Sequence, residues 1–358
     1  MSSYSVTLNP DNSWPEPLSE LPLRIHPSMA GKLDPEYVKF FEEELCNRPD
    51  ILETHKFPLE KTKAGGNVIP GQALPKEMAQ IYDIQIPRKH TSAEKPVPAR
   101  VFVPQGTPPA AGWPCTIWYH GGGWVLGGID TENSYCTHLA DNARCLVITV
   151  DYRLAPESPF PACVEDAFEA LLYVMDTKDL PIDNTKVCVA GSSAGGNLAA
   201  IMTHKYASSR LSKEYPPLKF QMLVVPVTDN SATGETQPSW RENKYTPQLP
   251  AAKMLWYRQL YLPLAGDTLT TPESSPLFYP DESFKSVPPA FIAAAECDVL
   301  RSEAEAYSEK LVKNGVESRI TVYKGVPHTA MVMNARLKQG ADLVRDTTGA
   351  VRNAFYGE

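Results

Sequence analysis

The chain has 358 residues, of which 42% are hydrophobic and 21% are charged, a composition that is typical of globular rather than disordered proteins. Its formal net charge of −8 disfavours a nucleic-acid-binding protein, because such a protein needs a basic face to neutralise phosphates. The same charge disfavours electrostatic docking on an anionic membrane, and the sequence has no apolar run of about 18 residues that would span one.

The seven cysteines are an odd number and include no C-x-x-C pair, so we expect neither a disulfide framework nor a thiolate zinc site. The first ten residues are polar and do not resemble a secretory signal. These features together predict a soluble, reduced, cytoplasmic protein that has no metal centre.

The N-terminal segment, residues 1–80, is irregular and contains one predicted helix, over residues 35–46. Asp34 would cap this helix and Pro35 would occupy its first position. Its apolar residues recur at helical spacing, so the helix is expected to bury one face.

From residue 81 onward, short apolar runs alternate with helix-like segments. The runs predicted to be strands are 81–86, 99–103, 115–119, 145–150, 186–190, 220–225, 290–295 and 319–323. The segments predicted to be helices are 132–142, 162–176, 194–208, 301–314 and 332–347. This alternation predicts βαβ units and a mostly parallel sheet, in which the first two strands form an antiparallel edge because their linker is short.

Residues 228–285 interrupt this rhythm and carry several aromatic side chains, with a helix predicted over 250–262. An excursion of this size between two strands is typical of a lid or cap over a substrate. The length fits either two domains or one large α/β domain with an insertion. We therefore expect a core made of residues 81–227 and 286–358, with residues 228–285 as a lid or cap.

The strongest motif is G-S-S-A-G, which directly follows the predicted strand 186–190 and opens the predicted helix 194–208. This is the strand–turn–helix context of a nucleophile elbow, in which Ser193 is the nucleophile. The flanking glycines, Gly191 and Gly195, leave room where the strand and the helix pass closely. The helix N-terminus adds partial positive charge near a developing oxyanion.

A serine nucleophile needs a base, and two histidines follow Ser193 along the chain. His204 lies within the predicted helix, about three turns beyond Ser193, and cannot reach its hydroxyl. His328 lies in the loop after the predicted strand 319–323, where the carboxyl end of a parallel strand can present an imidazole to the serine. His328 is therefore the predicted base.

The acid that orients the base is expected just past the strand 290–295. Asp298 is the first choice and Glu296 is the second. Asp229, which follows the strand 220–225, is a weaker candidate. The acid would hold the imidazole in the correct tautomer and stabilise the imidazolium.

A glycine-rich run, H-G-G-G-W at residues 120–124, follows the predicted strand 115–119. Three consecutive glycines allow backbone N–H groups to approach a substrate oxygen without interference from a Cβ atom. Such a loop supplies an oxyanion hole together with the N–H of the residue after the nucleophile, here Ala194.

These motifs together resemble those of the hormone-sensitive-lipase-like family of α/β-hydrolases, which includes many microbial carboxylesterases. The resemblance covers about residues 113–330 and rests on H-G-G-G-W at 120–124, D-Y-R-L-A-P-E at 151–157 and G-S-S-A-G-G-N-L-A at 191–199. It implies an α/β-hydrolase fold with a mostly parallel central sheet, helices on both faces and a helical cap. The resemblance also implies that this cap is built from residues 1–80 and 228–285.

The catalytic triad that the resemblance implies is Ser193, Asp298 and His328. The oxyanion donors that it implies are the backbone N–H groups of Gly122, Gly123 and Ala194. The residues that support these motifs are His120, Gly121, Gly191 and Gly195. One position departs from the family, which usually carries an acidic residue immediately before the nucleophile, whereas this chain has Ser192. The departure removes a charge beside the elbow but no catalytic group.

The expected activity is that of a serine carboxylesterase acting on a small-molecule ester, without a metal or organic cofactor. The aromatic residues of the cap suggest an apolar pocket, with Trp124 and Trp256 as candidate lining residues. Short or medium acyl chains, or a bulky aromatic or polyketide-like alcohol, would suit such a pocket. An acetyl ester of a specialised metabolite is expected by analogy alone.

Other functions use the same residues. An acyltransferase or a thioester-releasing hydrolase would keep the triad and change the acceptor or the acyl donor, and an amide hydrolase would change only the substrate. A ligand-binding protein on a hydrolase fold is disfavoured, because such proteins usually lose the base and His328 is present. A homodimer through an edge strand or the terminal helix is compatible with the sequence, although no residue pattern argues for it.

Overall fold

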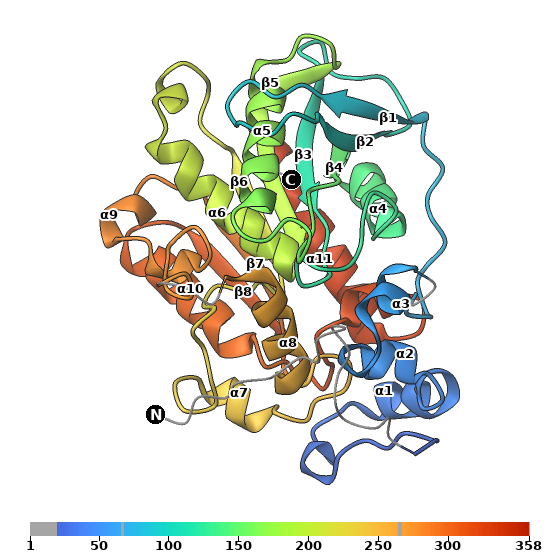
Figure 1. Cartoon of the computed structure of the whole chain (residues 1–358). Coiled ribbons are helices and arrows are strands. Elements are labelled where there is room, and N and C mark those ends of the chain that lie inside the picture. The colour runs from blue at the N-terminus through green and yellow to red at the C-terminus, as the bar shows by residue number, and fades with distance from the viewer. Residues whose placement is uncertain (1–19, 66–67, 264–266, 358) are drawn as a thin grey trace.

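The computed structural model describes residues 20–65, 68–263 and 267–357. Within these ranges the chain forms an eight-stranded sheet with the order β1-β2-β4-β3-β5-β6-β7-β8 (Figure 1). The strands are β1 Gln80–Ile86, β2 Val97–Val103, β3 Trp113–Tyr119, β4 Leu146–Val150, β5 Ile182–Ser192, β6 Phe220–Val224, β7 Ala290–Ala295 and β8 Ser318–Tyr323. Strand β2 is antiparallel to both β1 and β4, and the other pairs are parallel. The predicted mostly parallel sheet with an antiparallel edge is confirmed.

Helices surround this sheet. In the described residues they are α1 Pro35–Phe40, α2 Pro49–Leu52, α3 Leu59–Lys63, α4 Asn133–Ala143, α5 Ala162–Asp176, α6 Ala194–Ser208, α7 Pro238–Glu242, α8 Ala251–Tyr261, α9 Asp281–Phe284, α10 Arg301–Lys313 and α11 Lys338–Tyr356. Shorter turns of 3₁₀ type lie at Pro27–Met29, Thr54–Lys56, Arg210–Lys213, Pro276–Phe278 and Ala330–Met333, and a π-helical turn spans Phe41–Leu45. None of the helices in these ranges is both long and apolar enough to cross a membrane.

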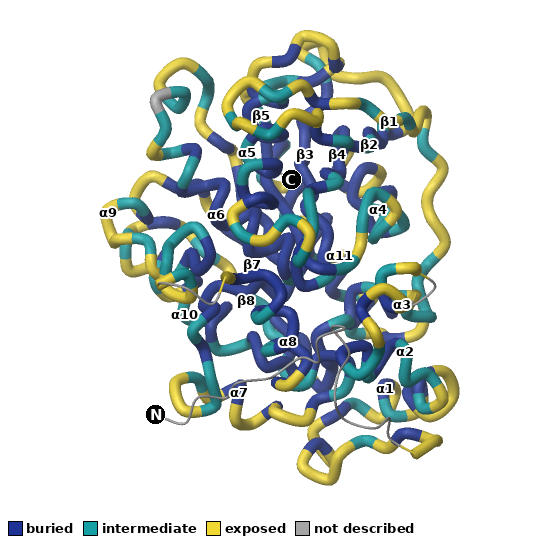
Figure 2. The backbone as a smooth tube through the Cα atoms, in the orientation of Figure 1, coloured by how far each residue is buried: buried dark blue, intermediate teal, exposed yellow. Residues whose placement is uncertain are grey.

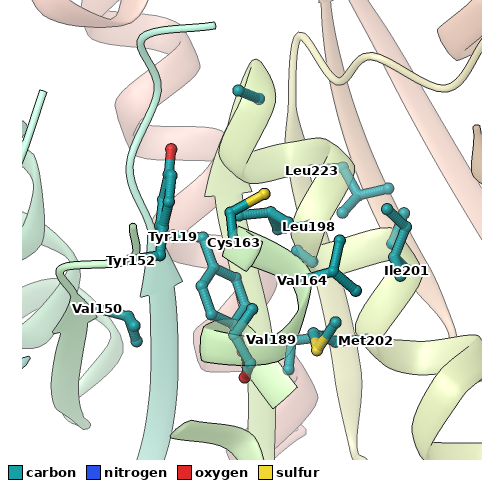
Figure 3. Close-up of a cluster of buried hydrophobic side chains, with 14 of the residues drawn as sticks. Tyr119, Val150, Tyr152, Cys163, Val164, Val189, Leu198, Ile201, Met202 and Leu223 are labelled. Carbon is teal, nitrogen blue, oxygen red and sulfur yellow. Dashed lines mark hydrogen bonds between the residues drawn. The ribbon is translucent and has the colours of Figure 1, made fainter. Parts of the chain in front are cut away.

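The sheet separates two hydrophobic cores, because successive side chains of a strand point to opposite faces. Ile117 and Tyr119 of β3 pack in the core that contains α5 and α6, whereas Trp118 packs in the core that contains α4 and α11. The buried part of the chain follows the central strands, and the exposed part lies at the periphery (Figure 2). In Figure 3, Leu198 and Met202 of α6 lie in one buried cluster with Val189 of β5. The strand and the helix that flank Ser193 are therefore held in a packed core.

The N-terminal segment begins its first α-helix as predicted. The side chain of Asp34 accepts a hydrogen bond from the N–H of Glu36 at 2.8 Å, and Pro35 occupies the first helical position. The helix continues into the π-helical turn Phe41–Leu45, so the helical stretch ends close to the predicted residue 46.

The N-terminal segment and the insertion contact one another. The buried ammonium of Lys253, on α8, donates to the carbonyl oxygen of Ile51 at 2.8 Å and to the hydroxyl of Thr54 at 2.9 Å. These contacts join residues some 200 positions apart in the chain (Figure 1). They support a cap that draws on both segments, and the boundaries of that cap stay a prediction.

The last helix differs from its prediction over residues 332–347. A 3₁₀ turn spans Ala330–Met333, and the α-helix runs over Lys338–Tyr356. The helix begins only at Lys338 because the backbone of Leu337 is extended, with φ −117° and ψ 128°. Gly340 then packs closely on the turn, where a Cβ atom would lie 2.5 Å from the turn's first carbonyl oxygen. The end is later because buried positions recur at helical spacing as far as Phe355.

Candidate active site

Ser193 stands on the sharp turn between β5 and α6. Its backbone has φ 53° and ψ −116°, a conformation that residues other than glycine rarely adopt. The N–H of Ser193 donates to the carbonyl oxygen of Val224 at 2.8 Å, and its carbonyl oxygen accepts from the N–H of Asn197 at 2.9 Å. Strand β6 and helix α6 therefore hold the strained turn in place, as is common at functional sites.

The two glycines of the motif are required by close backbone contacts. A Cβ atom on Gly191 would lie 2.4 Å from the carbonyl group of Gly195. A Cβ atom on Gly195 would lie 1.8 Å from the carbonyl oxygen of Tyr119, at the end of β3. The expected reason for these glycines, a close passage of strand and helix, matches the geometry.

Gly195→Ala is therefore expected to destabilise the fold by about 3 kcal/mol, since the new methyl group must displace backbone rather than a flexible side chain. The measurement is urea unfolding followed by circular dichroism. Gly349→Ala is the matched control, because Gly349 lies within α11 with no atom near its Cβ position. That control should gain about 1 kcal/mol from helix propensity. Equal stability of the two variants would contradict the close approach at Gly195.

His328 and Asp298 complete a hydrogen-bonded series with Ser193. Nε2 of His328 lies 2.8 Å from Oγ of Ser193, and Nδ1 of His328 lies 2.6 Å from Oδ2 of Asp298. A carboxylate only accepts hydrogen bonds, so Nδ1 carries the hydrogen and Nε2 presents its lone pair to the serine hydroxyl. The other oxygen of Asp298 accepts from the N–H of Leu300 at 3.0 Å. His328 and Asp298 are both buried, and this strengthens their interaction.

The alternative acids and the alternative histidine lie elsewhere. Glu296 pairs with the ammonium of Lys324 at 2.9 Å, and Asp229 accepts from the N–H of Ser231 at 2.8 Å. His204 is hydrogen-bonded to the hydroxyl of Ser283 at 2.7 Å. The structure thus brings together Ser193, His328 and Asp298.

The three expected oxyanion donors are free. Within the part of the chain that the structure describes, the backbone N–H groups of Gly122, Gly123 and Ala194 donate to no protein acceptor. Gly122 has φ 116° and Gly123 has φ 62°, values that favour glycine. Ala194 is the first residue of the 15-residue helix α6, so its N–H also lies at the positive end of the helix dipole. Unpaired N–H groups of this kind can stabilise an oxyanion.

His120 and Gly121, at the start of the oxyanion loop, make contacts that stabilise it. The ring of His120 stacks on Tyr152, with ring centroids 4.2 Å apart, and its Nδ1 lies 2.7 Å from the carbonyl oxygen of Gly121. The hydroxyl of Tyr152 donates to the carbonyl oxygen of His120 at 2.7 Å. Burial lowers the pKa of His120 to about 4, so the ring is neutral at neutral pH. It stabilises the loop by packing and hydrogen bonding rather than by charge.

The two tryptophans expected to line a pocket are fully buried. Trp124 stacks on Tyr261 with ring centroids 4.1 Å apart, and Trp256 packs beside Tyr257. Neither indole has exposed area, so a substrate contact would require a neighbouring side chain to move, and the pocket role of both stays a prediction. Tyr257 was not singled out from the sequence, yet its ring packs on Gly123, where a Cβ atom would lie 2.3 Å from it.

Glu132 is a second residue that sequence reasoning missed. It lies just before α4, and its carboxylate accepts a hydrogen bond from the hydroxyl of Ser192 at 2.5 Å. No local pattern reveals this contact, because the two residues are 60 positions apart and the loop before α4 has no motif of its own.

A metal ion at the site would need ligating side chains grouped around it. Among the described residues, no three or more His, Cys, Asp and Glu side chains are grouped so that they could hold one. The arrangement around Ser193 brings together a hydroxyl, an imidazole, a carboxyl group and three unpaired backbone N–H groups, a set of groups that can carry out acyl chemistry.

Comparisons with known proteins agree with the fold of this chain. A family model described as the α/β-hydrolase fold matches residues 116–332, which are more than half of the chain. The AB hydrolase superfamily protein C1039.03 of Schizosaccharomyces pombe is 55% identical over 331 residues, which are 92% of this chain and 96% of that protein. The carboxylesterase NlhH of Mycobacterium tuberculosis is 32% identical over 305 residues, which are 80% of this chain and 92% of that protein.

A solved structure of an α/β-hydrolase also matches this chain. LAE6, an α/β-hydrolase enzyme from the metagenome of Lake Arreo in Spain, matches with a TM-score of 0.80 and 31% sequence identity. The match covers 92% of this chain and 100% of that one, so it extends well beyond the region of the family model.

Proposed function

The chain belongs to the α/β-hydrolase family, and we propose that it is a serine carboxylesterase that hydrolyses a small carboxylic ester through an acyl-enzyme on Ser193. The observation that carries the proposal is the hydrogen-bonded series from Ser193 through His328 to Asp298, with distances of 2.8 and 2.6 Å. The similarity to a protein named carboxylesterase supports an ester as the substrate.

In the first half of the reaction, Oγ of Ser193 attacks the carbonyl carbon of the ester while Nε2 of His328 takes the hydroxyl proton. The carboxylate of Asp298 stabilises the imidazolium that forms. When the tetrahedral intermediate collapses, the C–O bond to the alcohol breaks and the alcohol leaves with the proton from His328. In the second half, His328 deprotonates a water molecule, which attacks the acyl carbon. The bond between that carbon and Oγ then breaks, the acid is released, and Oγ of Ser193 takes the proton back from His328.

The negative charge of each tetrahedral intermediate develops on the former carbonyl oxygen. The N–H groups of Gly122, Gly123 and Ala194 are suited to receive it, because they are unpaired within the described part of the chain. Loss of one such donor in a related chemistry lowers kcat by about 10²- to 10³-fold. The donors therefore account for a large share of the proposed rate enhancement.

We further propose a short or medium acyl chain as the preferred substrate, which includes acetyl esters. Tyr257 of α8 packs directly on Gly123, so the insertion reaches the oxyanion loop. An aromatic ring in contact with this loop limits the room beside the reacting carbonyl.

The experiment is the hydrolysis of p-nitrophenyl esters of graded chain length, together with labelling by a fluorophosphonate. We expect measurable hydrolysis with an optimum at a short or medium chain, and complete loss of activity after one equivalent of label. Tandem mass spectrometry of the labelled peptide should place the phosphonate on Ser193 and not on the adjacent Ser192, which serves as an internal control.

Two other outcomes would change the proposal. If the protein is labelled on Ser193 but hydrolyses none of the esters, hydrolysis is wrong, and transfer to an added alcohol or amine acceptor becomes the reaction to test. If the protein is neither labelled nor active, the serine mechanism itself is wrong.

A further inference from the structure

The residue before the nucleophile is where this chain departs from the family it resembles. Ser192 stands in the place of the usual acidic side chain, yet a carboxylate is present there in space. Oε1 of Glu132 lies 2.5 Å from Oγ of Ser192. The acidic group beside the elbow is thus supplied by a different loop, which joins the oxyanion loop to α4.

The carboxylate of Glu132 contacts three separate parts of the site. Besides Ser192 at the end of β5, it accepts from the indole N–H of Trp118, on β3, at 2.9 Å. It also accepts from the backbone N–H of Gly121, in the oxyanion loop, at 3.3 Å. The hydroxyl, the indole and the backbone amide all act as donors, and a carboxylate has enough acceptor sites for them.

The neighbouring residues hold the backbone and the side chain of Glu132 in place. Its backbone has φ 63°, in the left-handed region, and such a conformation persists only where neighbouring structure holds it. Gly121 approaches so closely that a Cβ atom there would lie 2.7 Å from Oγ of Ser192 and 3.2 Å from Oε1 of Glu132. Burial raises the pKa of Glu132, while its hydrogen bonds to Ser192 and Trp118 and the nearby His328 oppose that rise.

We propose that Glu132 is a positioning residue that fixes the oxyanion loop relative to the nucleophile elbow through its contacts with Gly121 and Ser192. This inference rests on the proposed function, since it concerns the oxyanion donors of that reaction. Gly121 directly precedes the donors Gly122 and Gly123, and consecutive glycines have little conformational preference of their own. The carboxylate of Glu132 therefore adds to the packing of His120 and Tyr257 in holding the two N–H groups at hydrogen-bond distance from the oxyanion.

Glu132→Gln separates this geometric role from a role of the charge. The amide oxygen can accept from Trp118 and Gly121, and the amide nitrogen can donate to Ser192, whose hydroxyl also accepts. Glutamine thus preserves all three contacts and removes the negative charge. Glu132→Ala removes all three contacts. Asp130→Asn is the matched control, because Asp130 lies in the same loop but is exposed and pairs with Arg100 at 2.6 Å.

The experiment measures kcat, KM and the thermal midpoint of these variants with the best ester of the panel. Glu132→Ala is expected to lower kcat by about 10²-fold, because small misplacement of a reacting group has an effect of this size. KM should stay within about threefold of wild type, since the proposed role concerns the transition state. Glu132→Gln should restore most of kcat, and Asp130→Asn should equal wild type.

Two results would overturn the inference. One is a stable Glu132→Ala variant with wild-type kcat. The other is a Glu132→Gln variant as slow as Glu132→Ala, which would assign the effect to charge. If Glu132→Ala does not fold, Ser192→Ala and Trp118→Phe each remove one contact, and wild-type kcat in both would also overturn it.

The same set of variants separates failure of this inference from failure of the proposed function. The proposed function is judged on wild type alone, by hydrolysis and by labelling of Ser193. If wild type is labelled but hydrolyses no ester, the rate of phosphonylation replaces kcat in every comparison, because the tetrahedral phosphonate uses the same oxyanion donors. If wild type is not labelled either, both proposals are wrong.

Discussion

Ser193→Ala and His328→Ala are each expected to lower kcat by about 10⁶-fold, and the double variant is expected to be no slower than either one. The reason is that the two side chains act as a unit across the 2.8 Å contact between Oγ and Nε2. Without the base the hydroxyl keeps its proton, and without the hydroxyl the base has nothing to activate. The residual rate in all three variants would come from substrate binding and from the oxyanion donors.

The measurement is steady-state kinetics with the best p-nitrophenyl ester, at enzyme concentrations high enough to detect the residual rate. His138→Ala is a suitable control, because His138 is a half-buried residue of α4 outside the site, and its Nε2 lies 3.0 Å from the carbonyl oxygen of Leu74. Additive losses in the double variant would contradict the proposal, because additivity would mean that Ser193 and His328 act in separate steps.

Strand and helix positions were predictable where the apolar pattern was strong. The run 290–295 became β7 with the same bounds, and the segments 162–176 and 194–208 became α5 and α6 with the same bounds. Buried residues make up most of each of these segments, so the apolar run itself indicates the element. The prediction of the last helix was wrong because the extended backbone of Leu337 separates the turn Ala330–Met333 from α11, and the apolar pattern does not mark that break.

The candidate site was predictable for a different reason. Nucleophile, base and acid each follow a strand, and the carboxyl ends of parallel strands lie at one edge of the sheet. Asp298 was the first choice and Glu296 the second, although the two residues share one turn after β7, and the contacts agree with that order. Lys324 takes the carboxylate of Glu296 at 2.9 Å, and this leaves Asp298 for His328.

Contacts between loops that are distant along the chain could not be predicted from the sequence. Tyr257 reaches Gly123 from the insertion, and Glu132 reaches Ser192 across 60 residues of chain. In both cases the partner is backbone or a small side chain. The residue types at these positions therefore give no sign of the contact in the sequence. The nucleophile elbow is recognisable from the five-residue motif G-S-S-A-G, whose residues are consecutive. The contacts of Tyr257 and Glu132 come from other parts of the fold.

Asp298→Asn is expected to lower kcat by about 10⁴-fold, although the side chain keeps its size. Oδ1 of Asp298 accepts from the N–H of Leu300 at 3.0 Å, so an asparagine would keep its oxygen on that side. Its NH₂ group would then face Nδ1 of His328 and donate to it. The imidazole would be forced into the tautomer that carries hydrogen on Nε2, and Nε2 would no longer accept the proton of Ser193.

Glu296→Gln is the matched control, because the same change from carboxylate to amide then falls two residues earlier, on a side chain that pairs with Lys324. We expect it to keep kcat within about threefold of wild type, since an ion pair at the surface contributes little and a glutamine oxygen can still accept from the N–H of Gly325. The comparison uses kcat from the same ester and thermal midpoints to exclude unfolding. A large loss in Glu296→Gln with a small one in Asp298→Asn would reverse the choice of acid, whereas equal and small losses would mean that His328 needs no carboxylate to orient it.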